Sequence, residues 1–94
     1  MQLGNGTFLL GDCFDRMAEI PDNSVDMVLA DLPYGTTQCS WDSVLPLARL
    51  WGEYWRVCKP NAAIVLTAMQ PCTTVLIMSN INNFRYCWVW RKSR

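Results

Sequence analysis

The decisive stretch of this sequence is Val25-Asp26-Met27-Val28-Leu29-Ala30-Asp31-Leu32-Pro33-Tyr34. Its first six residues are almost continuously apolar, which is typical of a strand buried on both faces of a parallel sheet. This strand, predicted over residues 25–30, runs directly into the tetrapeptide 31–34. In open α/β sheets, ligands bind beyond the carboxyl ends of the strands. The tetrapeptide is therefore predicted to lie at a ligand site.

The patterns on both sides of this strand predict alternating strands and helices. We expect further strands over residues 7–10, 62–68 and 84–90. We expect helices after an N-cap at Asp12, over residues 44–58 and over residues 71–80. This order predicts a single α/β domain over residues 1–94, with a mostly parallel sheet and helices on both faces.

The helix expected over residues 44–58 has two distinct faces. The charged residues Arg49, Glu53 and Arg56 share one side of it and are predicted to face water. The opposite side is predicted to pack in the core, and its members are Val44, Leu47, Ala48, Trp51, Trp55 and Cys58.

The charges are unevenly distributed along the chain. The whole sequence is 51% hydrophobic and 17% charged, whereas about 25% charged residues is typical of soluble domains. Residues 84–94 hold four bases and no acid, although the chain as a whole is neutral. A basic end on an acidic body fits a nucleic-acid contact, and it also fits a solvated tail.

Several classes of protein are disfavoured by the composition. The five cysteines form no C-x-x-C pair and there is no histidine, so we expect no metal site. The odd number of cysteines and the lack of a signal-like start predict reduced thiols in the cytoplasm. No apolar stretch approaches the roughly 18 residues that a membrane span needs. We therefore expect a cytoplasmic protein without membrane association.

The tetrapeptide 31–34 offers the groups that recognise an exocyclic amino group on a base. The Asp31 carboxylate and the Leu32 carbonyl, held by the stiff step to Pro33, can accept hydrogen bonds from such an amino group. The ring of Tyr34 can stack on a base that has been extruded from the duplex. Polar and aromatic turns after strands are common, so these four residues alone leave a purely structural role open.

The surrounding sequence resembles the S-adenosylmethionine-dependent DNA amino-methyltransferases, whose signature is Asp-Pro-Pro-Tyr. The similarity covers nearly the whole chain in order. It runs through Gly11-Asp12-Cys13, residues 21–26, residues 31–37, Trp41-Asp42-Ser43, residues 59–66 and residues 88–92. The resemblance implies a partial Rossmann-like methyltransferase fold and methyl transfer to a DNA base, with adenine as the expected target. It points to the permuted class met in phages, prophages and restriction–modification systems.

The resemblance also implies roles for individual residues. Asp31 and the Leu32 carbonyl would hold the target amino group, with Pro33 fixing the turn and Tyr34 stacking on the base. Asp12, together with Asp31, would lie near the S-adenosylmethionine cofactor, at its adenine end. The chain has Leu32 where the family usually has proline. Because the expected role there belongs to a main-chain carbonyl, this change need not abolish activity.

A second departure concerns the family's glycine-rich cofactor loop, which these 94 residues do not contain. Gly4-Asn5-Gly6 precedes the first predicted strand, so it does not substitute for that loop. We therefore expect an incomplete domain that binds S-adenosylmethionine poorly alone and acts on DNA with a second polypeptide. Two alternatives stay open: a fragment of an RNA or protein-glutamine methyltransferase, and a non-catalytic remnant that binds DNA or a partner protein.

Overall fold

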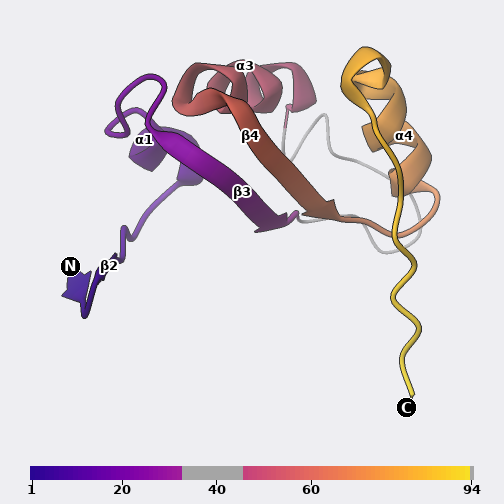
Figure 1. The fold of residues 1–94 in the computed structure, drawn as a ribbon, viewed down its shortest axis with the longest axis horizontal. Helices are drawn as coiled ribbons and strands as arrows, with labels where there is room; N and C mark the ends of the chain where they lie inside the picture. Colours follow the sequence, from indigo (N-terminus) through magenta and orange to yellow (C-terminus); the bar gives the residue numbers. More distant parts are fainter. Residues whose placement is uncertain (33–45, 94) are drawn as a thin grey trace.

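Two parallel strands form the centre of the structure. The computed structural model describes residues 1–32 and 46–93, so Pro33, Tyr34 and the loop expected over residues 35–43 lie outside the described residues. Strand β3 (Val25–Asp31) pairs with β4 (Cys58–Thr67), and helix α3 (Leu47–Val57) precedes β4 in the chain (Figure 1). Parallel strands need such a crossover connection. The parallel pair at the centre confirms this part of the prediction.

Shorter elements flank this unit. Strands β1 (Gln2–Leu3) and β2 (Gly6–Thr7) form a small antiparallel hairpin that is separate from the β3–β4 sheet. The remaining elements are helix α1 (Cys13–Met17), helix α4 (Cys72–Ser79) and the 3₁₀ turn η1 (Ile81–Asn83).

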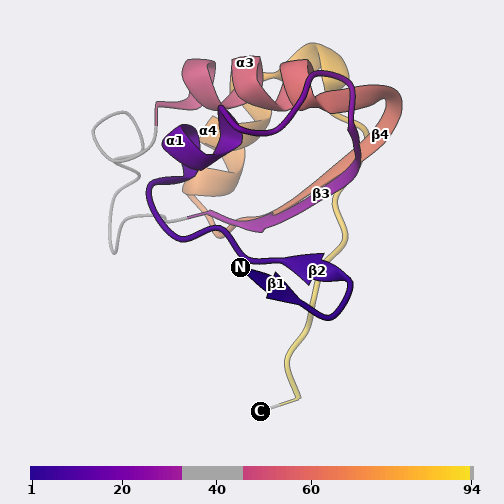
Figure 2. The ribbon, with the colours of Figure 1, turned by 90° about the vertical axis from the view of Figure 1, so that its left-hand side faces the viewer.

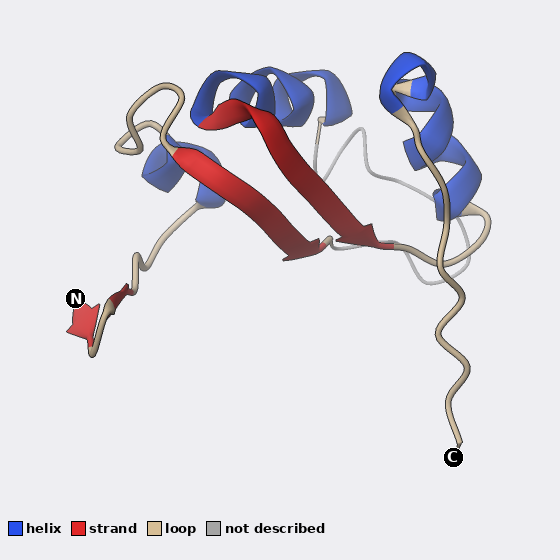
Figure 3. Ribbon diagram, viewed as in Figure 1, coloured by secondary structure: helices blue, strands red, loops and turns tan. Residues whose placement is uncertain are grey.

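Both short helices were expected, but two of the expected strands were wrong. Residues 8–10 belong to no strand: β2 ends at Thr7, although Phe8 still exchanges backbone hydrogen bonds with Met1 across the hairpin. Residues 84–90 are drawn as loop and have no strand partner within the described part of the chain (Figure 3). An alternating pattern predicts how a strand would be buried, but a strand also needs a neighbour with free backbone groups.

A single hydrophobic core lies on one face of the β3–β4 sheet. Helices α1, α3 and α4 contribute to it, and Figure 2 shows them together above the sheet. The sheet contributes partly buried residues that alternate along each strand, as a sheet with one covered face requires. The core residues are Phe14, Leu32, Leu47, Leu50, Tyr54, Cys72 and Leu76, with Val28, Ala30, Ile64 and Leu66 of the sheet packed against them.

The other face of the sheet is exposed, which corrects the expectation of helices on both faces. Met27 lies opposite Ala63 and Leu29 lies opposite Val65 on this face, and Leu29 is 72% exposed. Parallel strands are almost always covered on both faces. The described residues therefore form a small α/β unit whose sheet has one open apolar face.

The buried side of α3 agrees only in part with the predicted side: Leu47 and Cys58 are buried and Trp51 packs against the core, as expected. Leu47, Leu50, Tyr54 and Val57 are buried, whereas Trp55 is 52% exposed. The cause lies in Arg56, which was expected to face water. Its guanidinium donates hydrogen bonds to the carbonyl oxygens of Met17 (2.7 Å) and Ile20 (2.8 Å).

The Arg56 contacts hold the charged side of α3 against the end of α1 and the turn that follows it. The same guanidinium pairs with the Asp22 and Glu53 carboxylates at 2.8 and 2.9 Å, and these bonds raise the pKa of Arg56. The turn before β3 also docks on α3, because the amides of Asn23 and Ser24 donate to the Arg56 and Val57 carbonyls. The charged side of α3 thus faces α1 and this turn.

We predict that Leu50→Ala destabilises the fold by about 2–5 kcal/mol, because it removes a buried side chain and leaves a cavity. Leu50 is only 1% exposed, and Trp55 on the same helix provides the matched control. Urea unfolding followed by circular dichroism would measure both variants. Trp55→Ala should change the unfolding free energy far less, and equal losses would contradict the assigned helix face.

Candidate functional site

The candidate site is a pocket of about 520 Å³ at the carboxyl end of β3. Helices α1 and α3 form its walls, and the end of β3 forms its floor. This is the edge of the sheet at which α/β proteins bind ligands. The lining residues are Asp12, Cys13, Phe14, Met17, Ala30, Asp31, Leu32, Pro46, Arg49, Leu50 and Tyr54.

Asp12 reaches the pocket because of a special backbone position before it. Gly11 has a φ of 138°, a conformation that residues with a Cβ atom rarely adopt. The chain then enters α1 with Asp12 as the N-cap, and its Oδ1 accepts a hydrogen bond from the Phe14 amide at 2.9 Å. This confirms the predicted cap. It leaves the second carboxylate oxygen of Asp12 without a hydrogen-bond partner in the part of the chain that is described.

Asp31 ends β3 and lies opposite Thr67, which ends β4. The Thr67 hydroxyl donates a hydrogen bond to the Asp31 carboxylate at 2.5 Å, so the carboxylate is held in one orientation. The Asp31 side chain is exposed at the pocket and makes no ion pair with a described residue. It can therefore accept further hydrogen bonds from a ligand.

Leu32 anchors the start of the tetrapeptide. Its side chain belongs to the hydrophobic core and is buried, which fixes the main chain directly after Asp31. The pocket thus brings together three of the predicted site residues: Asp12, Asp31 and Leu32. Pro33 and Tyr34 lie outside the described residues.

Arg49 is a pocket residue that the sequence reasoning assigned to the solvent. Its guanidinium carbon lies 4.2 Å from the centroid of the Phe14 ring, a cation–π contact between α3 and α1. It makes no ion pair in the described structure, so its charge remains available at the pocket. The positions of Asp12, Phe14 and Arg49 in the sequence do not predict this contact.

Two buried groups near the pocket stay protonated at neutral pH. Burial raises the pKa of Tyr54, and the neighbouring Cys13 and Cys58 add to the shift. Burial also raises the pKa of the Cys58 thiol. The pocket therefore offers a neutral phenol, and its other polar side chains include Asp12, Asp31 and Arg49.

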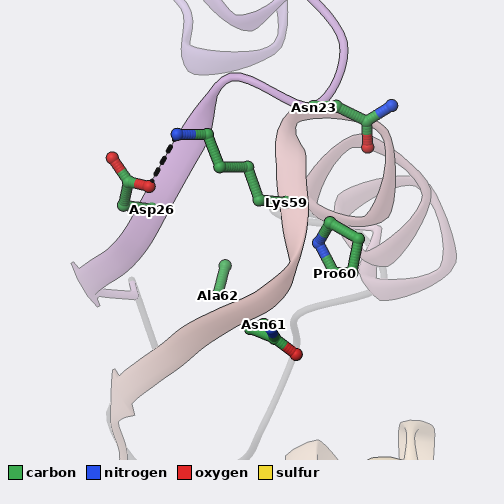
Figure 4. A pocket seen from close by; sticks show the side chains of 6 residues that line it. All are labelled: Asn23, Asp26, Lys59, Pro60, Asn61 and Ala62. Carbon is green, nitrogen blue, oxygen red and sulfur yellow. Dashed lines mark hydrogen bonds and ion pairs between the residues drawn. The ribbon is translucent and has the colours of Figure 1, made fainter.

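A second pocket, of about 380 Å³, lies at the opposite, amino end of the two strands. Figure 4 shows Lys59 reaching from β4 toward Asp26, away from Asn61 and Pro60. The ammonium of Lys59 lies 2.8 Å from the Asp26 carboxylate, so its charge is already neutralised. Among the residues that line this pocket, the two charged side chains neutralise each other, and the pocket carries no functional assignment.

Within residues 1–32 and 46–93 there is no group of three or more side chains that could hold a metal ion. The helices described in these ranges include none with the length and hydropathy of a membrane-spanning segment. No protein-family model matches the chain, and no solved structure matches it.

Asp12 offers a way to separate its structural role from a binding role. We predict that Asp12→Ala lowers stability by about 1 kcal/mol, because α1 loses its cap. Asp12→Asn keeps an oxygen that can accept from the Phe14 amide, so it should leave stability nearly unchanged. Thermal or urea unfolding of both variants would test this. Equal destabilisation by the two substitutions would mean that the charge of Asp12, and not its capping bond, supports the fold.

Proposed function

We propose that this chain is part of an S-adenosylmethionine-dependent amino-methyltransferase with a Rossmann-like fold, and that DNA adenine is its substrate. The observation that carries the proposal is the meeting of Asp12 and Asp31 at one pocket. These two carboxylates lie 19 positions apart in the sequence, and the motif resemblance assigns both to the cofactor and target site. The pocket also lies at the expected edge of the sheet.

The groups around the pocket suit the proposed cofactor. S-adenosylmethionine would supply the methyl group from its sulfonium, whose sulfur would leave as a neutral thioether. Asp12 can accept hydrogen bonds at the adenine end, next to the apolar side chains of Phe14 and Leu50. The two carboxylates of Asp12 and Asp31 outnumber the single guanidinium of Arg49 at this pocket, which favours a cationic ligand.

The proposed role of Asp31 is to orient the target amino group. Its carboxylate, held by the Thr67 hydroxyl, would accept one hydrogen of the amino group. The Leu32 carbonyl would accept the other hydrogen, and Tyr34 would stack on the extruded base. Two fixed acceptors turn the nitrogen lone pair toward the methyl donor. Positioning and oriented dipoles then provide most of the rate enhancement.

A second polypeptide, or a segment outside these 94 residues, is part of the proposal. It would supply the glycine-rich loop and cover the open sheet face at Met27, Leu29 and Val65. The same open face favours a second candidate function, in which the chain binds a partner protein without catalysing a reaction. The two candidates differ in whether Asp31 is needed for a chemical step.

We predict that Asp31→Ala lowers methyl transfer by roughly a hundredfold or more, because an oriented acceptor is lost in the transition state. The test is a chimera in which residues 1–94 replace the matching segment of a complete DNA amino-methyltransferase. Labelled-methyl transfer would be measured on DNA, on RNA and on a glutamine-containing protein.

The matched control is Asp26→Ala, which removes a carboxylate from the other end of the same strand. It should leave the rate within a few-fold of the parent chimera, since only a surface ion pair to Lys59 is lost. Full activity of the Asp31→Ala chimera would refute the assigned role. Transfer to RNA or to glutamine, and not to DNA, would change the proposed substrate.

We predict that the 94-residue chain alone binds no S-adenosylmethionine at micromolar concentrations. Asp12 and Asp31 offer two isolated contacts, which are too few to offset the several kcal/mol that association costs. Titration calorimetry on the purified chain is the direct measurement. A stoichiometric micromolar isotherm would mean that this pocket holds the cofactor without the glycine-rich loop.

A further inference from the structure

The carboxyl-terminal segment, residues 84–92, is the most exposed aromatic part of the described chain. Trp88 is 83% exposed, Trp90 is 86% exposed and Tyr86 is 68% exposed. Figure 1 shows this segment as an extended trace that leaves α4 and points away from the sheet. Large aromatic side chains gathered at one exposed place are typical of binding surfaces.

The aromatic rings have a regular spacing. Tyr86, Trp88 and Trp90 alternate with other residues, so in an extended chain they lie on the same side. The ring centroids of Tyr86 and Trp88 are 6.0 Å apart, with an angle of 35° between the ring planes. Two rings that sandwich a base are separated by about two stacking steps of 3.4 Å, or roughly 6.8 Å. A small adjustment would therefore allow a base to insert between these two rings.

The basic residues of the segment differ from those in the rest of the chain. Arg16, Arg56 and Lys59 form ion pairs, and Arg49 lies over the Phe14 ring. In contrast, the structure gives no ion pair within its described ranges to Arg85, Arg91 or Lys92. Residues 84–94 contain no acid, so this positive charge is not neutralised locally.

We infer that residues 84–92 bind single-stranded nucleic acid without sequence preference. Stacking on aromatic side chains together with phosphate contacts from cations is the general mode of such binding. Tyr86, Trp88 and Trp90 would stack on successive bases, and Arg85, Arg91 and Lys92 would contact the phosphates. A duplex hides the faces of its bases, so single strands should bind more tightly. The inference requires neither S-adenosylmethionine nor methyl transfer.

The other reading of this segment is a strand that pairs with the sheet of a second copy. Its aromatic residues would then be covered by protein, and the chain would be a dimer. The three unpaired cations favour nucleic acid, because strand pairing gives them no partner. The two interpretations predict different effects of salt and of aromatic substitution on oligonucleotide affinity and on the oligomeric state.

The test uses the full chain fused to an inert soluble carrier, with the carrier alone as the blank. Fluorescence anisotropy would follow a labelled oligothymidine of about 12 nucleotides. We expect a dissociation constant of about 10⁻⁵ M, with weaker binding to a duplex of the same length. Replacing Arg85, Arg91 and Lys92 by glutamine should reduce the slope of log K against log salt by about 2.

Aromatic variants test the stacking. Trp88→Ala with Trp90→Ala should weaken binding at least tenfold, an order-of-magnitude expectation for two lost stacking partners. Trp88→Phe keeps a ring and should retain most of the affinity. Trp55→Ala removes an exposed tryptophan of α3 and is the matched control, which should bind as the parent does.

Three results would overturn the inference. The first is no binding above the carrier blank, and the second is unchanged binding by the double tryptophan variant. The third is a dimer in analytical ultracentrifugation that the double variant converts to a monomer, with no change in oligonucleotide affinity. None of these measurements depends on the methyltransferase proposal, so each hypothesis can fail without the other.

Discussion

The parallel pairing of β3 with β4 determines where the core and the candidate site lie. Because both strands point the same way, Asp31 and Thr67 meet at one edge of the sheet and form their hydrogen bond there. The chain must then return to the other edge before β4 begins, and α3 makes most of that return. The start of α3 consequently lies beside the end of β3, which brings Arg49 to the same pocket as Asp31. One pairing thus creates both the core and the candidate site.

The strands and helices with strong local signals were predictable. The apolar run of β3, the aspartate cap of α1 and the helix after Pro71 needed only local information. The buried face of α3 was predictable only in part, because the charged side with Arg56 was expected to lie opposite the core. Carbonyl oxygens of Met17 and Ile20 accept hydrogen bonds from the Arg56 guanidinium. These acceptors belong to other elements of the fold, so the helical pattern of one segment cannot predict them.

The candidate site shows the same limit. Asp31 was singled out because it follows a predicted strand, and Asp12 because the family resemblance implies a cofactor role for it; both line the pocket. Arg49 was missed because its contact with Phe14 depends on how α1 and α3 pack. The alternation in residues 84–90 was correctly seen but incorrectly assigned to a paired strand. Sequence periodicity predicts the conformation of one segment, but it does not identify the segment that packs against it.

The open face of the sheet also has a chemical consequence. Met27 lies on that face and is more than half exposed, so its thioether is accessible to oxidants. Oxidation to the sulfoxide would place a polar group beside Leu29 and Ala63, and it would weaken any apolar contact made there. A covering protein surface would in turn shield the sulfur. The redox state of one methionine would therefore record whether this face was covered when the oxidant was present.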